Sequence, residues 1–61
     1  MKISAAQKNY AGLRLFRLAA AGFEANEVRM MEPCDIQIAY RWAFGATLNL
    51  KSCELIKALA K

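Results

Sequence analysis

Three residues that are uncommon inside helices divide this chain into short segments. They are Gly22, Pro33 and Gly45, and each falls where a helix has to end. Glycine adopts the left-handed conformation of a C-terminal cap, and proline disfavours helical geometry in the residue before it. β-Branched residues are few and no run alternates between apolar and polar residues, so strands are not expected. The pattern therefore predicts an all-α chain.

Four helices fit between these boundaries. Ser4 and Asp35 are typical N-cap residues, and we expect them to begin the first and third helices. The last segment is clearly amphipathic, with apolar residues repeating every three or four positions. The expected helices cover residues 4–21, 25–31, 35–44 and 49–61. Together they predict one compact four-helix domain over residues 1–61, with a helix-turn-helix at its centre.

The length of the chain limits the core that it can bury. A chain of 61 residues buries only about 60% of the surface that its unfolded form exposes, so its core stabilises it marginally. Hydrophobic residues nevertheless make up 57% of the sequence, which is more than a monomer of this length can hide. We therefore expect a symmetric homodimer, since closed two-fold symmetry is the commonest oligomeric arrangement.

The residue types exclude most forms of catalysis. The chain has no histidine and no glycine-rich phosphate loop, so we do not expect an enzyme. Two cysteines, Cys34 and Cys53, are too few for a zinc site, and neither a metal nor another cofactor is expected. We interpret both thiols as small, buried, reduced groups, with a disulfide or redox switch as the alternative.

The expected first helix is apolar over a wider arc than one packing partner needs. Its polar side is narrow. On a helical wheel with 100° per residue, the residues of that side are Gln7, Tyr10, Arg14, Arg17 and Ala21. This helix is therefore either central to the fold or in contact with another subunit. No uncharged apolar run is long enough to span a membrane or to act as an export signal, so we expect a cytoplasmic protein without a membrane partner.

Charge is distributed unevenly along the chain, whose formal net charge is +4. Residues 1–23 carry four basic side chains and no acid, residues 24–35 carry four acids against Arg29 alone, and the tail from residue 41 is basic again. The basic ends are compatible with a phosphate backbone or with ordinary solvated helix faces. Arg14 and Arg17 have the same two interpretations: they bind phosphate together, or they lie on a solvent-exposed side of the first helix.

Residues 22–42 read G-F-E-A-N-E-V-R-M-M-E-P-C-D-I-Q-I-A-Y-R-W. A glycine and an apolar residue precede a short helix, Asp35 takes a cap position, and Tyr40, Arg41 and Trp42 close the next helix. This segment resembles the helix-turn-helix of small bacterial and phage regulators, such as Cro-like repressors and excisionase-type factors. The resemblance implies a DNA-binding transcriptional regulator that places helix 35–44 in the major groove of a palindromic site.

The resemblance also assigns roles to side chains of helix 35–44. Gln37 would read a base edge, most naturally an adenine, while Arg41 would contact guanine or phosphate and Tyr40 would contact phosphate. Trp42 would belong to the core. With Ile36 on the same face and the two arginines of the first helix, the residues predicted to contact DNA are Ile36, Gln37, Tyr40, Arg41, Arg14 and Arg17.

A second class of function stays open. The middle segment is acidic, and Ile36, Ile38 and Phe44 are apolar where a DNA-reading helix is usually polar. This pattern favours a helical protein–protein interaction module or inhibitor that binds through the apolar surface around Ile36, Tyr40 and Phe44. For Ile36 and Ile38 themselves, burial in the core is the simpler interpretation. A structural dimer without a separate ligand is a third possibility.

Overall fold

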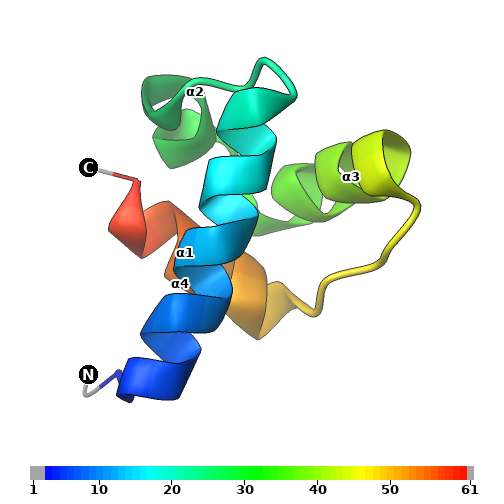
Figure 1. The fold of residues 1–61 in the computed structure, drawn as a ribbon. Coiled ribbons are helices and arrows are strands. Elements are labelled where there is room, and N and C mark those ends of the chain that lie inside the picture. The colour runs from blue at the N-terminus through cyan, green and yellow to red at the C-terminus, as the bar shows by residue number, and fades with distance from the viewer. Residues whose placement is uncertain (1–2, 61) are drawn as a thin grey trace.

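A computed structural model describes residues 3–60, which form four α-helices and no strand (Figure 1). The helices are α1 (Ala5–Ala20), α2 (Ala25–Met30), α3 (Pro33–Phe44) and α4 (Leu50–Leu59). The predicted all-α, four-helix architecture is confirmed, and the predicted bounds lie within two residues of the observed ones. Lys61, which the prediction placed in the last helix, lies outside the described residues.

Local hydrogen bonds define several helix ends. The Ser4 hydroxyl accepts from the N–H of Gln7 while the Gln7 side chain accepts from the N–H of Ser4, which is a reciprocal capping box. At the start of α4, the Asn49 side chain accepts from the N–H of Ser52 at 2.7 Å. Gly45 ends α3 with φ at 70°, a left-handed conformation that favours glycine. Each of these three helix ends is formed by residues close to one another in the sequence.

Helix α3 begins two residues before Asp35, the N-cap that the sequence predicted. Glu32 is the N-cap and Pro33 is the first helical residue. Proline suits this position because its φ is already helical and because the N–H groups of a first turn have no partner within the helix. Asp35 lies instead in the first turn, where a carboxylate interacts favourably with the helix dipole. Pro33 therefore both separates α2 from α3 and starts α3.

Helix α4 is the element on which the other helices pack. It contacts α1 most extensively, then α3 and then α2, whereas α1, α2 and α3 make few direct contacts with one another. In Figure 1, α4 lies behind α1, with α2 above and α3 to the right. The order helix, turn, helix is present in α2 and α3, but these two helices contact each other less than each contacts α4.

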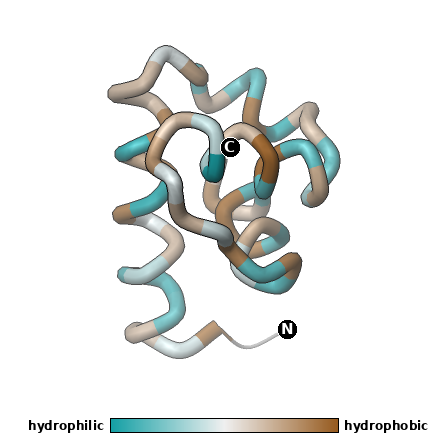
Figure 2. The backbone as a smooth tube through the Cα atoms, turned by 90° about the vertical axis from the view of Figure 1, so that its right-hand side faces the viewer, coloured by the Kyte–Doolittle hydropathy of each residue, from teal (hydrophilic) through white to brown (hydrophobic). Residues whose placement is uncertain are grey.

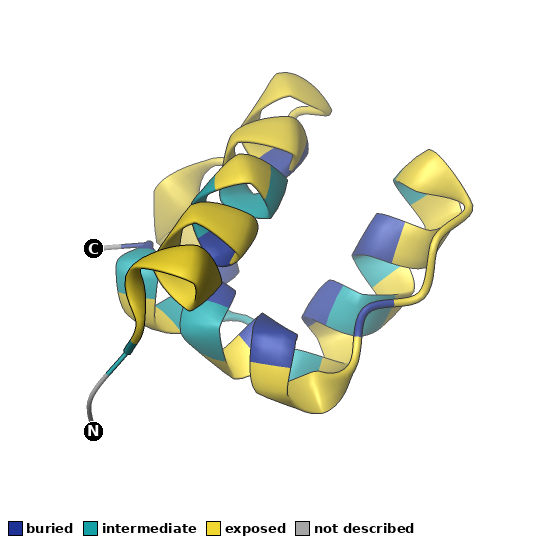
Figure 3. Cartoon of the chain, turned by 60° about the horizontal axis from the view of Figure 1, so that its bottom comes forward, coloured by how far each residue is buried: buried dark blue, intermediate teal, exposed yellow. Residues whose placement is uncertain are grey.

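The core is a single small cluster. Its buried hydrophobic members are Ala11, Leu18, Val28, Ile36, Tyr40, Leu48, Cys53, Ile56 and Ala60. On α4, the buried residues Ser52 and Cys53 lie four and three positions before Ile56, so the three share one side of the helix. Figure 3 shows buried residues on the inner sides of the helices and exposed residues on the outer sides. Each helix thus contributes one side to the core and leaves its other side exposed.

Many apolar side chains stay at the surface even though the fold is compact. The radius of gyration is 10.3 Å, close to the value of about 10.5 Å expected for a folded chain of this length. Figure 2 shows hydrophobic residues distributed over all four helices. The large hydrophobic residues that are exposed among the described residues are Tyr10, Leu13, Phe16, Met30, Ile38, Trp42, Phe44 and Leu50. The apolar surplus expected from composition therefore lies on the surface.

Replacing Ile56 by valine should lower the free energy of unfolding by about 1 kcal/mol, because the lost methyl group leaves a void where α4 meets the core. Ile38→Val makes the same chemical change at an exposed side chain of α3 and should alter that free energy by less than about 0.5 kcal/mol. Urea unfolding at low protein concentration, followed by circular dichroism, measures both. Equal losses in the two variants would contradict the placement of α4 at the centre of the core.

Candidate functional site

Helix α3 has a buried face and an exposed face of different composition. Ile36 and Tyr40, four residues apart, lie in the core and are 0% and 1% exposed. Successive helical residues are about 100° apart, so Ile38 lies about 200° from Ile36, and Trp42 about 200° from Tyr40, and both point to the opposite side. That side carries exposed residues, and we define the outer face of α3 as Cys34, Asp35, Ile38, Arg41 and Trp42.

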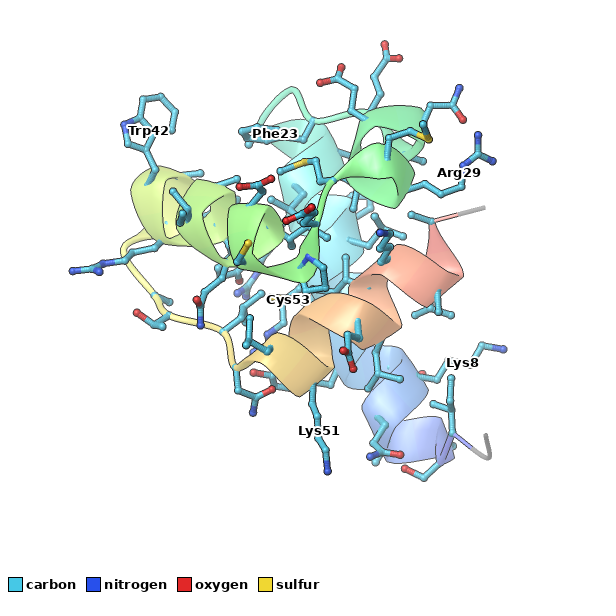
Figure 4. All side chains as sticks on the ribbon, turned by 180° about the vertical axis from the view of Figure 1, so that it is seen from behind. Lys8, Phe23, Arg29, Trp42, Lys51 and Cys53 are labelled. Atoms are coloured by element: carbon cyan, nitrogen blue, oxygen red, sulfur yellow. The ribbon has the colours of Figure 1, made fainter. Side chains whose placement is uncertain are left out.

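Trp42 is the most exposed large hydrophobic side chain of the described residues, at 83%. In Figure 4 its indole extends from α3 away from the other helices. Ile38 lies one turn earlier on the same face and is 64% exposed. Side chains four residues apart are neighbours on a helix, so these two form a short apolar ridge. Adjacent exposed apolar groups of this kind are typical of surfaces that contact another molecule.

Two hydrogen bonds join the inner side of α3 to the rest of the fold. Nη1 of Arg17, on α1, donates to the Tyr40 hydroxyl at 3.0 Å. Nε2 of Gln37 donates to the carbonyl oxygen of Leu48, in the segment before α4, at 2.6 Å. The ring of Phe44 also packs on Tyr40, with centroids 4.8 Å apart and planes tilted by 40°. These contacts tie the inner side of α3 to α1 and to the α3–α4 connection.

The two arginines of α1 are also engaged within the fold. The guanidinium of Arg14 stacks over the ring of Tyr10, with Cζ 3.4 Å from the centroid, and its Nη1 donates to the Tyr10 carbonyl oxygen at 3.2 Å. Arg17 is exposed, but its Nη1 is bonded to Tyr40. Arg17 therefore links α1 to α3, whereas the contacts of Arg14 stay within α1.

The orientation of α3 corrects several predictions. Ile36 and Tyr40, which were expected to face DNA, are buried, and Trp42, which was expected in the core, is exposed. The resemblance placed Trp42 inward, whereas the observed helix is turned by about half a turn, which exchanges its two sides. Burial of Ile36 in the core, expected as the simpler interpretation, is confirmed. The same interpretation of Ile38 is wrong.

Gln37 and Arg41, the other α3 residues predicted to contact DNA, lie outside the core. Gln37 is half-buried, and its amide nitrogen is bonded to Leu48. Arg41 is exposed, and it is the one cation in the sequence of α3, where Asp35 is the one acid. The outer face is therefore apolar along its centre and carries one charge of each sign.

The two thiols lie in different surroundings, although both were expected to be buried. Cys53 is buried in α4, and desolvation by burial raises the pKa of its thiol above the ordinary value of 9.0, so the thiol stays neutral. Cys34 is exposed on the outer face, where its Sγ lies 3.7 Å from Oε2 of Glu32. Potential ligand atoms of Glu32, Cys34 and Asp35 lie within 4.8 Å of one another, but all three residues are exposed. Both cysteines are free, as predicted.

Comparisons with protein-family models, with curated proteins and with solved structures give no match. Within residues 3–60, no helix is both long enough and apolar enough to cross a membrane. The chemistry of the exposed surface is therefore the basis for assigning a function.

Removing the hydroxyl of Tyr40 should destabilise the fold with little change in core volume. Tyr40→Phe deletes the acceptor of the Arg17 hydrogen bond and should lower the free energy of unfolding by about 1 kcal/mol. Tyr10→Phe, at an exposed ring on α1, is the matched control and should change it by less than about 0.5 kcal/mol. If urea unfolding gave the same free energy for both variants, the Arg17–Tyr40 bond would not contribute to the stability of the fold.

Proposed function

We propose that this chain is a helical protein-binding module and that its binding surface is the outer face of α3. The observation that carries the proposal is the 83% exposure of Trp42 beside Ile38, on a helix whose other side is fixed in the core. Tryptophan is enriched at the energetic centres of protein interfaces, since its ring buries much apolar area and few torsions have to be ordered. A helix that is already rigid binds with little further ordering cost.

The residues of this surface differ from those that the sequence suggested for an interaction module. Of the three predicted residues, Ile36 and Tyr40 are buried, and Phe44 packs on Tyr40. The proposed surface uses Ile38 and Trp42 instead. The homodimer expected from the apolar surplus is one form of this function, because a second copy can occupy the same face.

The charges on the outer face favour a protein over DNA. Non-specific affinity for DNA depends on several cations that neutralise phosphates. Helix α3 offers Arg41 alone, and Asp35 opposes it on the same face. Protein interfaces commonly have an apolar centre and a polar rim. Ile38 and Trp42, flanked by Asp35 and Arg41, have that composition.

Cross-linking from position 42 tests the proposal. The variant Trp42→p-benzoylphenylalanine, irradiated in the cells that produce it, should form discrete protein adducts, because a residue at the centre of an interface lies against the partner. The control carries the same photoreactive group at Met30, which is 79% exposed on α2 and lies outside the outer face. Adducts of position 42 with nucleic acid, or equal yields from the two positions, would contradict the proposal.

DNA binding by a transcriptional regulator is the second candidate, favoured by the net charge of +4 and by the exposure of Arg17 and Arg41. Fluorescence anisotropy of a labelled random-sequence duplex at about 50 and 200 mM salt tests it, because phosphate-driven binding falls by orders of magnitude over this range. For a protein-binding module we expect no binding at either salt from folded protein. Binding at the lower salt that is lost at the higher salt, and weakened by Arg41→Gln, would favour the DNA-binding candidate.

A further inference from the structure

We infer that the exposed side of α1 binds the surface of an anionic lipid bilayer, with the helix lying in the plane of the headgroups. This surface is separate from the outer face of α3 and does not depend on the function proposed for that face. We define the outer face of α1 by six exposed residues, which are Ala6, Lys8, Leu13, Phe16, Arg17 and Ala20.

Helix α1 packs on the core through one side only. Ala11 and Leu18 are its buried residues, and α4 is the helix that it contacts most. Leu13 lies about 200° from Ala11 around the helix and therefore points away from the core. Phe16 has the same relation to Leu18 and is 71% exposed. In Figure 1 the helix lies in front of α4, and Figure 3 shows exposed residues along its length. The fold thus leaves an apolar pair on α1 uncovered.

Two exposed cations border this apolar pair. Leu13 and Phe16 are about 60° apart around the helix and one turn apart along it. Lys8 lies about 80° beyond Phe16, and Arg17 lies about 40° beyond Leu13 on the other edge. A helix that lies on a membrane has this arrangement. Its apolar centre enters the boundary of the acyl chains, and the lysines and arginines at its edges extend to the lipid phosphates.

Charge complementarity selects an anionic surface as the occupant. Helix α1 contains Lys8, Arg14 and Arg17 but no acid, and the first acid of the chain, Glu24, comes after it. A second copy packed on the same face would bring cations toward cations, which is unfavourable. On α4, Glu54 is exposed on the side away from the core. The positive charge of α1 is therefore not offset within the helix.

The combination of apolar and basic residues favours lipid over other anions. The outer face of α3 carries one charge of each sign, whereas the outer face of α1 carries cations alone. An anionic bilayer offers phosphates to Lys8 and Arg17 and an apolar layer beneath them to Phe16. The bond of Arg17 to Tyr40 is compatible with this contact, because a guanidinium has several N–H donors and the bond uses one of them.

The expectation of a protein without a membrane partner rested on the lack of a segment long enough to span a bilayer. A helix that lies on the surface needs no such segment. What identifies it is an apolar side that the core does not use, and the structure shows this side on α1.

A tryptophan reporter tests which face meets the lipid. The variant Phe16→Trp/Trp42→Phe moves the only indole of the chain to the outer face of α1, whereas the unchanged chain carries it on the outer face of α3. Vesicles of phosphatidylcholine with about 30% phosphatidylserine are added to each protein. The emission from position 16 should shift to shorter wavelength, and the emission from position 42 should change little. No shift at position 16, or an equal shift at position 42, would overturn the inference.

Charge reversal tests the role of the basic edges. Lys8→Glu should lower the partition coefficient on the same vesicles, measured by co-sedimentation, by about tenfold. The control Arg41→Glu makes the same change of net charge at an exposed position of α3 and should lower it by less than about threefold. Vesicles of phosphatidylcholine alone should bind the unchanged chain at least about tenfold more weakly. Circular dichroism shows that each variant is folded. Equal losses in the two variants, or equal binding to both kinds of vesicle, would contradict the inference.

The membrane surface and the protein-binding module fail separately. A lipid-dependent shift at position 16 without protein adducts from position 42 supports the membrane surface and contradicts the protein-binding module. Protein adducts from position 42 without a shift at position 16 have the opposite meaning.

Discussion

Packing against α4 is the interaction on which the rest of this structure depends. The other three helices contact α4 far more than they contact one another, so each is positioned by its own packing against this one element. The buried stripe of α4 includes the small side chains of Ser52 and Cys53 beside Ile56. Small residues let a neighbouring helix approach closely, and α1, the longest helix, makes the most extensive contact. A domain of this size has little other core to rely on.

The orientation of α3 follows from this packing. Ile36 and Tyr40 lie in the cluster that α4 organises, and the hydrogen bonds of Tyr40 to Arg17 and of Gln37 to Leu48 hold the helix from the same side. Once that side is fixed, the residues two positions further along must point to solvent. The exposure of Trp42 is thus a consequence of how the core is filled, and the proposed function depends on it.

Local sequence predicted the helices well, because helix ends are determined by a few neighbouring residues. The cap formed by Ser4 and the left-handed Gly45 are examples. Which side of α3 is buried was not predictable in this way. The pairs Ile36/Tyr40 and Ile38/Trp42 have the same four-residue spacing on opposite sides of the helix, so periodicity predicts a helix equally well with either pair inside. The choice depends on packing against residues of other helices, above all those of α4, and the resemblance to helix-turn-helix proteins favoured the wrong side.

Tryptophan fluorescence tests the central claim most directly, because Trp42 is the only tryptophan of the chain. The claim is that the outer face of α3 is open to solvent in the folded subunit and is covered only by a partner. In a dilution series, we expect the emission of the most dilute folded protein to match that of free N-acetyltryptophanamide. An emission that stays at short wavelength on dilution and moves only in urea would place the indole in the core and contradict the claim.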